Sequence, residues 1–279
     1  MSKNSRRAIV IGLGVGRQHA DFLRSKDWEV VTVDRSQEAD FTSAEAALDT
    51  REGHLCVVAS HDPDHFYHIK MAWERGMDVF CEKPICIVPC HLKEIAQIVR
   101  NRPEQRFCCN FPLRAFFPKV KKPVPIMNVR YNYGRLRKLG EWRAAFPYSI
   151  ALGGGVHMID LALLSFKERV VSVFARGNNI NGLKMIPHTC ISALCRMESG
   201  AILNIICDFT YDGIHEHRVD WRNGKDMTVW VNQASAPKTW CLERFINGKY
   251  EEPGFDAHSV AFAIDESLRE HREVLVKYQ

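Results

Sequence analysis

The segment that decides the fold reads Arg7-Ala8-Ile9-Val10-Ile11-Gly12-Leu13-Gly14-Val15-Gly16. Its first half is an apolar run, the pattern of a strand buried inside a parallel sheet, and its second half is a glycine-rich turn. Helical spacing follows from Gly16 to Ser25, with Ala20 and Leu23 on one face. A buried strand, a glycine turn and a helix in this order are typical of the first unit of a dinucleotide-binding sheet.

The same alternation continues to about residue 110. Further apolar strands are predicted at 28–34, 55–60, 78–81 and 106–110, with helices at about 64–75 and 89–100. Strands of this length separated by helices require a parallel sheet with right-handed crossovers. We therefore predict an α/β fold whose first domain, residues 1–121, is a doubly wound Rossmann sheet.

The sequence pattern changes at Lys121-Lys122-Pro123-Val124-Pro125, a basic hinge interrupted by prolines. Beyond it strands follow one another directly, at 126–133, 170–176, 189–197, 201–209, 217–221 and 227–231. Turn residues at 198–200 and 222–225 predict hairpins between pairs of these strands. One helix at 156–166 interrupts the series and another, at about 259–276, closes it. We predict a second, α+β domain over residues 122–279, with an open, mostly antiparallel sheet.

Composition narrows the class of protein. The 279 residues are 46% hydrophobic and 25% charged, as in a soluble globular protein. A net charge of +5 is too mild to indicate nucleic-acid binding, and no apolar run is long enough for a signal peptide or a membrane span. The ten cysteines contain no Cys-x-x-Cys pair, so we expect buried thiols in a reducing cytoplasm and no metal site.

Asp34 lies at the end of the second predicted strand, about 20 residues after the glycine turn, where an acid accepts hydrogen bonds from the adenosine ribose. Its charge would repel a 2′-phosphate, so NAD is favoured over NADP, although Arg35 would accept that phosphate if Asp34 turned away. An ordinary tight turn with a surface acid is the alternative interpretation. The predicted cofactor contacts are Gly12, Gly14, Val15, Gly16, Asp34, Arg35, Ser60, His61, His65, Glu82 and Lys83.

Four segments, 11–20, 58–65, 76–84 and 153–160, resemble the glucose–fructose oxidoreductase/inositol dehydrogenase/rhizopine catabolism (Gfo/Idh/MocA) family. The triplet Glu82-Lys83-Pro84 is the most specific of these matches. The resemblance covers nearly the whole chain and implies a Rossmann domain followed by a domain built on an open antiparallel sheet. It also implies a nicotinamide-dependent oxidoreductase.

The resemblance implies particular roles for the matching residues. Lys83 matches the family's lysine, whose ammonium group hydrogen-bonds the reacting oxygen, and Pro84 would fix where that lysine points. His157 matches the histidine that serves as general acid or base in many members. Asp160 resembles the acid one helical turn later that contacts substrate. Lys83 and His157 are thus the predicted catalytic residues, and both are also predicted substrate contacts.

Two arginines complete the predicted substrate site. Arg114 follows the fifth strand, and Arg143 lies in an aromatic and basic stretch before the glycine triplet at 153–155. Guanidinium groups bind a carboxylate or phosphate bidentately, but the same arginines are equally typical of a solvated sheet edge.

The sequence departs from the family pattern at two places. The glycine turn is one residue shorter than Gly-x-Gly-x-x-Gly, and Gly153 stands where many members have an aspartate. The latter pattern looks closer to the nucleotide-sugar branch, such as the UDP-N-acetylglucosaminuronate 3-dehydrogenases. We therefore expect hydride transfer to or from a sugar or sugar nucleotide, in surface-polysaccharide or amino-sugar biosynthesis. The alternatives are a non-catalytic nucleotide or sugar sensor, and an NADPH-dependent reductase of a non-carbohydrate substrate.

An open sheet exposes an apolar face unless something covers it. Alternation in the strands at 189–209 offers six apolar side chains to one face or the other, Ile191, Ala193, Cys195, Leu203, Ile205 and Cys207. We therefore expect a homo-oligomer, either a dimer or a tetramer.

Overall fold

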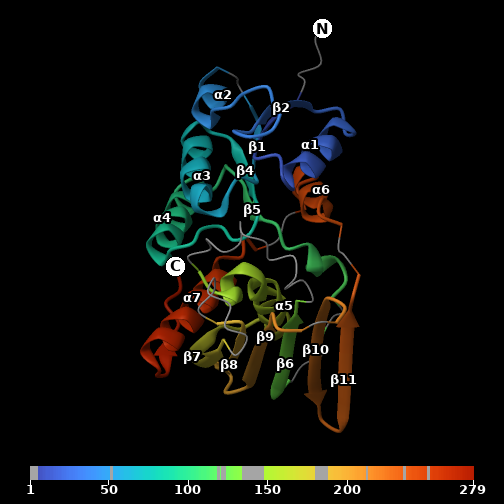
Figure 1. Ribbon diagram of the computed structural model, residues 1–279, viewed down its shortest axis with the longest axis vertical. Helices are drawn as coiled ribbons and strands as arrows, with labels where there is room; N and C mark the ends of the chain where they lie inside the picture. Colours follow the sequence, from blue (N-terminus) through green and yellow to red (C-terminus); the bar gives the residue numbers. More distant parts are fainter. Residues whose placement is uncertain are drawn as a thin grey trace. The chain divides into compact units, whose positions relative to one another are not determined.

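The computed structural model describes residues 6–50, 53–117, 120, 124–133, 148–179, 188–211, 213–234, 237–249 and 252–279 (Figure 1). The chain forms two compact units. Unit 1 comprises Met1–Pro112 and Ala236–Gly254, and unit 2 comprises Leu113–Ser235 and Phe255–Gln279. The chain first passes from unit 1 to unit 2 after Pro112, nine residues before the predicted domain boundary at 121. The segment Ala236–Gly254, which the sequence pattern assigned to the second domain, belongs to unit 1.

Unit 1 is built on a five-stranded, all-parallel sheet with the order β2-β1-β3-β4-β5, which confirms the predicted Rossmann architecture. Its strands are β1 (Arg7–Ile11), β2 (Glu29–Val33), β3 (Leu55–Val58), β4 (Asp78–Cys81) and β5 (Phe107–Cys109). The three central strands are almost fully buried because helices cover both faces of the sheet.

The helices of unit 1 are α1 (Gly16–Arg24), α2 (Ala44–Thr50), α3 (His65–Glu74), α4 (Pro89–Arg100) and α6 (Trp240–Ile246). Figure 1 shows α1 and α6 on one side of the sheet and α2, α3 and α4 on the other. The sequence pattern assigned no helix to α6. Its buried side chains Cys241, Leu242 and Phe245 join the core formed by Val10 and Leu23, which explains why this late segment belongs to unit 1.

Unit 2 is built on a seven-stranded sheet with the order β11-β10-β6-β9-β8-β7-β12. The strands are β6 (Ile126–Asn132), β7 (Val170–Asn178), β8 (Cys190–Met197), β9 (Ile202–Asp208), β10 (Glu216–Asn223), β11 (Asp226–Asn232) and β12 (Val274–Leu275). All neighbours are antiparallel except β6 and β9, which are parallel. The two predicted hairpins are confirmed, with Gly200 (φ 86°) and Gly224 (φ 61°) supplying the left-handed turn residues.

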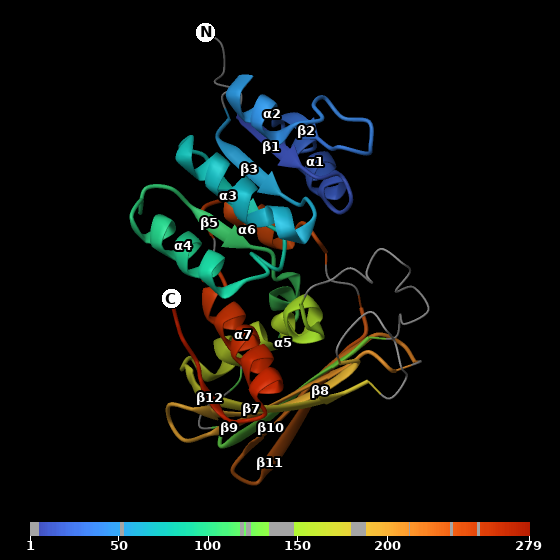
Figure 2. The same cartoon turned by 60° about the vertical axis from the view of Figure 1, so that its left-hand side comes forward.

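Helices α5 (Val156–Phe166) and α7 (Phe255–Glu270) lie on the same face of this sheet (Figure 2). The predicted closing helix was too long at its end. It stops at Glu270, His271 adopts a left-handed conformation (φ 57°), and Val274 then pairs with Val173 as part of β12.

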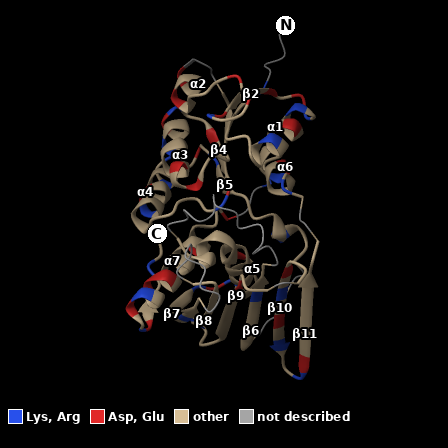
Figure 3. Ribbon diagram, in the orientation of Figure 1, with Lys and Arg blue, Asp and Glu red and all other residues tan. Residues whose placement is uncertain are grey.

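The six apolar residues of β8 and β9 named above all lie on the helix-covered face, each at most 1% exposed. They are therefore core residues of unit 2, and the opposite face is formed by other side chains. No helix in the described residues is long and apolar enough to cross a membrane. Acidic and basic residues both occur along α1 in unit 1 and along α7 in unit 2 (Figure 3).

Candidate functional site

The glycine turn after β1 is shaped for close backbone approach. Gly12 has φ 90°, and a Cβ atom there would lie 2.4 Å from the carbonyl oxygen of Ala59, so only glycine fits. Its N–H donates to Val33 O at 2.7 Å, which ties the turn to β2. Around Gly14 a Cβ would meet nothing within 4 Å, so the backbone there is open to an approaching phosphate. α1 starts two residues later, at Gly16.

Asp34 is fixed directly beside this turn. Its Oδ2 accepts a hydrogen bond from Leu13 N–H at 2.6 Å, and its Oδ1 accepts from the N–H groups of Ser36 and Gln37 at 2.8 and 3.0 Å. Burial raises the pKa of Asp34, but these hydrogen bonds outweigh it and lower the pKa below the usual range. The carboxylate is therefore ionised at neutral pH and held in one orientation.

A cavity of about 410 Å³ opens at the carboxyl ends of β1, β2 and β3. Five predicted cofactor contacts line it, Gly12, Asp34, Arg35, Ser60 and His61. This is the edge of an open parallel sheet at which nucleotides bind. The residues present fit NAD, because the open backbone at the turn can receive the pyrophosphate and Asp34 Oδ2 can accept from the ribose hydroxyls.

Two features of this cavity disfavour a 2′-phosphate. Arg35, the residue that would accept such a phosphate, lies 3.6 Å from the carboxylate of Asp64. Glu45 also lines the cavity and adds a second acidic residue to its wall. Neither acid was singled out from the sequence, since nothing local marks them as members of the same cavity.

The three histidines that follow β3 have different partners. His61 lines the cavity. His68, which the cavity also touches, lies 2.8 Å from Ser60 Oγ, and burial lowers its pKa to about 4, so its ring is neutral at pH 7. His65 is fully buried, with its Nε2 3.0 Å from Ser60 O and its Nδ1 2.7 Å from Pro84 O. It supports the cavity wall from behind.

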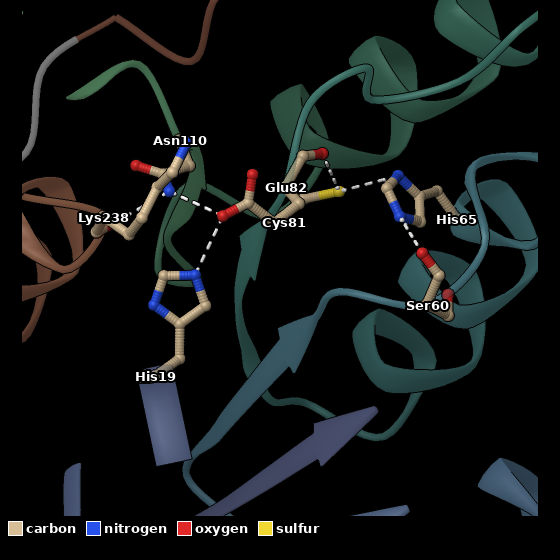
Figure 4. A network of polar contacts seen from close by, with 7 residues as sticks. All are labelled: His19, Ser60, His65, Cys81, Glu82, Asn110 and Lys238. Carbon is tan, nitrogen blue, oxygen red and sulfur yellow. Dashed lines mark hydrogen bonds and ion pairs between the residues drawn. The ribbon is translucent and has the colours of Figure 1, made fainter. Parts of the chain in front are cut away.

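Glu82 is buried at the end of β4, where His19 Nε2 and Asn110 Nδ2 lie 2.9 and 2.7 Å from its Oε1 (Figure 4). Burial raises the pKa of this carboxyl, but those hydrogen bonds bring it down to about 2, so Glu82 is ionised. A carboxylate only accepts, so the His19 tautomer carries its proton on Nε2. Lys83 is half-buried, and the Lys83–Pro84 peptide is cis.

In unit 2 the helix carrying His157 begins after a π-helical turn, Ala151–Gly155. A Cβ at Gly154 would lie 2.3 Å from the ring of Tyr131, so glycine lets the turn pack closely on β6. Asp160 is one helical turn beyond His157. Its carboxylate pairs bidentately with Arg114, Oδ2 with Nε at 2.8 Å and Oδ1 with Nη2 at 2.5 Å.

The two side chains of that pair are only 5% and 4% exposed. These predicted substrate contacts are therefore buried against each other, and both carboxylate oxygens face the guanidinium. Arg143, the other predicted substrate arginine, lies outside the described residues. Lys83 belongs to unit 1 and His157 to unit 2.

Residues 6–109 match a family described as an oxidoreductase family with an NAD-binding Rossmann fold, Gfo/Idh/MocA. The match covers the Rossmann part of the chain and indicates an NAD-binding fold of this oxidoreductase type there. A curated relative, the uncharacterized oxidoreductase YhhX of Escherichia coli (strain K12), is 24% identical in an alignment 198 residues long that covers 62% of this chain. That alignment covers 54% of YhhX, so the chain spans about half the length of this relative.

Two solved structures share the fold across both units. Myo-inositol 2-dehydrogenase from Lactobacillus plantarum has a TM-score of 0.83 at 18% identity, over 98% of this chain and 100% of that one. Scyllo-inositol dehydrogenase from Lactobacillus casei, with bound NAD(H) and scyllo-inositol, has a TM-score of 0.81 at 14% identity, over 98% and 99%. Both units of this chain therefore have the fold of these two dehydrogenases.

Proposed function

We propose that this protein is an NAD(H)-dependent dehydrogenase acting on a hydroxyl-bearing carbon of a sugar, a sugar nucleotide or a cyclic polyol. The observation that carries the proposal is the cavity where ionised Asp34 is fixed beside the open glycine turn. The intact Lys83 and His157 support a catalytic rather than a purely binding role. The inositols named for the two structural neighbours support a polyhydroxylated ring as substrate.

Each catalytic residue has a defined task in this proposal. A bound nicotinamide supplies the acceptor for hydride in oxidation and the donor in reduction. The ammonium group of Lys83 donates a hydrogen bond to the reacting oxygen and stabilises its partly anionic form. His157 takes the hydroxyl proton on a ring nitrogen in the oxidative direction and returns it in the reductive one.

Arg114 and Asp160 serve this site indirectly. Because each is buried and satisfies the other, the pair holds the chain just after β5 against the helix that carries His157. We keep Arg143 as the proposed contact for a negatively charged substrate group, since a guanidinium binds a carboxylate or phosphate bidentately.

The test starts with cofactor titrations, following energy transfer from tryptophan to NADH and then to NADPH. Oxidation of a panel of inositols, hexoses, uronic acids and UDP-sugars follows, monitored at the NADH absorbance. Lys83→Met should abolish turnover while NADH binding stays near wild type. Lys93→Met, at an exposed position on α4, is the matched control and should keep full activity.

The outcomes separate the alternatives. Turnover retained in Lys83→Met would remove the role assigned to that lysine. NADH binding without turnover on the whole panel would favour a sensor. Binding and turnover confined to NADPH would favour a reductase of another substrate, and binding of neither cofactor would contradict the enzyme assignment altogether.

We further propose that the open face of the unit 2 sheet pairs with a second copy of this chain. Phe174, Leu194 and Ile202 are 38–50% exposed there. On the same face Asn128 donates to Asp220 across β6 and β10, and the next cross-strand pair on that face is Arg130 with Arg218. Because this face carries both acidic and basic side chains, two copies related by a twofold axis can place opposite charges against each other. Light scattering should report a dimer or a tetramer, and a monomer at micromolar concentration would contradict this.

A further inference from the structure

Lys83 lies between two neighbours that the fold holds in place. Glu82 and Pro84 are both buried, whereas Lys83 itself is half-buried. A lysine side chain is a flexible chain of four methylene groups that ends in a compact charge. The region that its ammonium group can reach is therefore set by where its backbone is held. The contacts of Glu82 and Pro84 therefore hold the backbone on both sides of Lys83.

The contact on the Glu82 side comes from α1 and β5. His19 on α1 and Asn110 just after β5 both donate to the ionised Oε1 of Glu82. Hydrogen bonds to an ionised group are shorter and stronger than neutral ones. The His19 ring is itself fixed, because it is fully buried and packs edge-on against Phe80 with the ring centres 5.4 Å apart.

The contact on the Pro84 side comes from α3. His65 Nδ1 lies 2.7 Å from the carbonyl oxygen of Pro84, and its other nitrogen lies 3.0 Å from the carbonyl oxygen of Ser60. The ring is fully buried, and Figure 4 shows it beside Cys81, with Sγ 3.7 Å from Nδ1. The His65 ring therefore lies between the Pro84–Ile85 peptide and the segment that follows β3.

We propose that His19 and His65 are positioning residues for Lys83, one acting through Glu82 and the other through Pro84. His19, His65, Glu82 and Pro84, together with Asn110, form what we call the lysine clamp. The inference rests on the proposed function, because it concerns the group that contacts the reacting oxygen. It assigns a task to residues that are too buried to touch substrate, since His19 and His65 are both 0% exposed.

His19 contacts Glu82 through Nε2, whereas His65 contacts Pro84 through Nδ1. This difference allows an experiment that separates a positioning role from a role in core packing alone. The amide nitrogen of glutamine reaches about where Nε2 lies, and that of asparagine about where Nδ1 lies. His19→Gln therefore keeps a donor to Glu82 and His19→Asn loses it. At His65 we assign the ring proton to Nδ1, the nitrogen with the shorter contact, so the order is reversed. His65→Asn then keeps a donor to Pro84, and His65→Gln loses it.

The experiment compares these four variants with His91→Asn and His91→Gln as matched controls. His91 stacks on Phe66 in the same unit and lies outside the lysine clamp. NADH affinity shows that each variant is folded. The turnover number on the substrate found above, with KM for NAD, measures the effect on chemistry. Pulse acylation of Lys83 followed by peptide mass spectrometry, with Lys93 as internal reference, reports the lysine without any substrate.

We expect His19→Asn and His65→Gln to lower kcat by about tenfold or more with KM for NAD nearly unchanged, because small misplacements of catalytic groups are costly. The same two variants should change the acylation rate of Lys83 and leave Lys93 unaffected. His19→Gln, His65→Asn and the His91 pair should stay near wild type. If a His19 variant fails to bind NADH, Asn110→Ser, which removes the second donor to Glu82, replaces it in the comparison.

Equal effects of asparagine and glutamine at either position would overturn the lysine clamp, as would unchanged Lys83 acylation in all four variants. If His65→Gln instead of His65→Asn keeps the wild-type kcat and Lys83 acylation rate, the contact with Ser60 matters and the contact with Pro84 does not. A protein that turns over no substrate but shows the crossed acylation pattern would contradict the proposed function and leave the positioning role supported.

Discussion

Removing Arg114 should leave a buried, uncompensated carboxylate on Asp160. The two side chains are 4% and 5% exposed, and the pair is bidentate, so little water reaches either charge. Breaking a buried pair from one side costs about 3–5 kcal/mol. Arg114→Met should therefore lower the free energy of unfolding of unit 2 by that amount, and the thermal midpoint by roughly 6–20 °C.

The assay is urea unfolding followed by circular dichroism, with hydrogen exchange of the α5 amides as a local readout. Asp160→Asn should be comparably harmful, and the double variant should recover most of the loss because no charge is left buried. Arg169→Met is the matched control. Its pair with Asp256 lies in the same unit at 3.0 Å, but the side chains are 52% and 38% exposed, so the cost should stay below about 1 kcal/mol. Equal effects of the two arginine variants, or simple additivity of Arg114→Met and Asp160→Asn, would refute the reasoning.

Three further changes test the charges of Asp34 and Glu82, described above, and of Asp265, a residue of α7. Asp34→Asn should narrow the preference for NADH over NADPH by about 1–2 kcal/mol, roughly 5- to 30-fold, because one charge facing a 2′-phosphate is lost; paired fluorescence titrations measure this, and an unchanged ratio would contradict it. The pKa of Glu82 is lowered to about 2, so its ionisation stabilises the fold above about pH 4.5 and is lost as the pH falls toward 2. Glu82→Gln should be about 3 kcal/mol less stable than wild type at pH 6, and this difference should shrink as the pH falls. Urea unfolding at several pH values measures it, and a difference that stays constant with pH would contradict the prediction. Burial raises the pKa of Asp265 to about 6, so the stability that its protonated carboxyl contributes is full below about pH 4 and is lost as the pH rises through 6. Asp265→Asn should therefore be up to about 3 kcal/mol more stable than wild type at pH 8. A thermal midpoint of the variant no higher than that of wild type at this pH would contradict the prediction.

Local pattern was enough to predict most of the secondary structure. The strands of unit 1 read as short apolar runs between helices, and the turns at Gly200 and Gly224 mark hairpins by themselves. Two features are not local. Alternation along β8 gave two faces but did not say which one α5 and α7 cover, and the docking of α6 depends on a core far away in the sequence.

The same distinction applies to the candidate site. Gly12 and Asp34 could be predicted because a short motif with fixed spacing places them on neighbouring strands. The pairing of Arg114 with Asp160 joins residues 46 positions apart, and that of His19 with Glu82 joins residues 63 positions apart. No single-sequence pattern links positions so distant, so Asp160 was interpreted from resemblance alone, and His19 was not singled out.

The late position of α6 has a consequence for how the protein is made. The chain passes between the two units at 112/113, 235/236 and 254/255, so neither unit is a continuous stretch. Cys241, Leu242 and Phe245 complete the core of unit 1, yet the ribosome adds them more than 120 residues after β5. A growing chain that has reached residue 200 therefore carries a Rossmann sheet whose α1 flank is still uncovered. Nascent-chain folding of this protein should be completed late, and truncation anywhere before α6 should yield an aggregation-prone fragment rather than an independent nucleotide-binding domain.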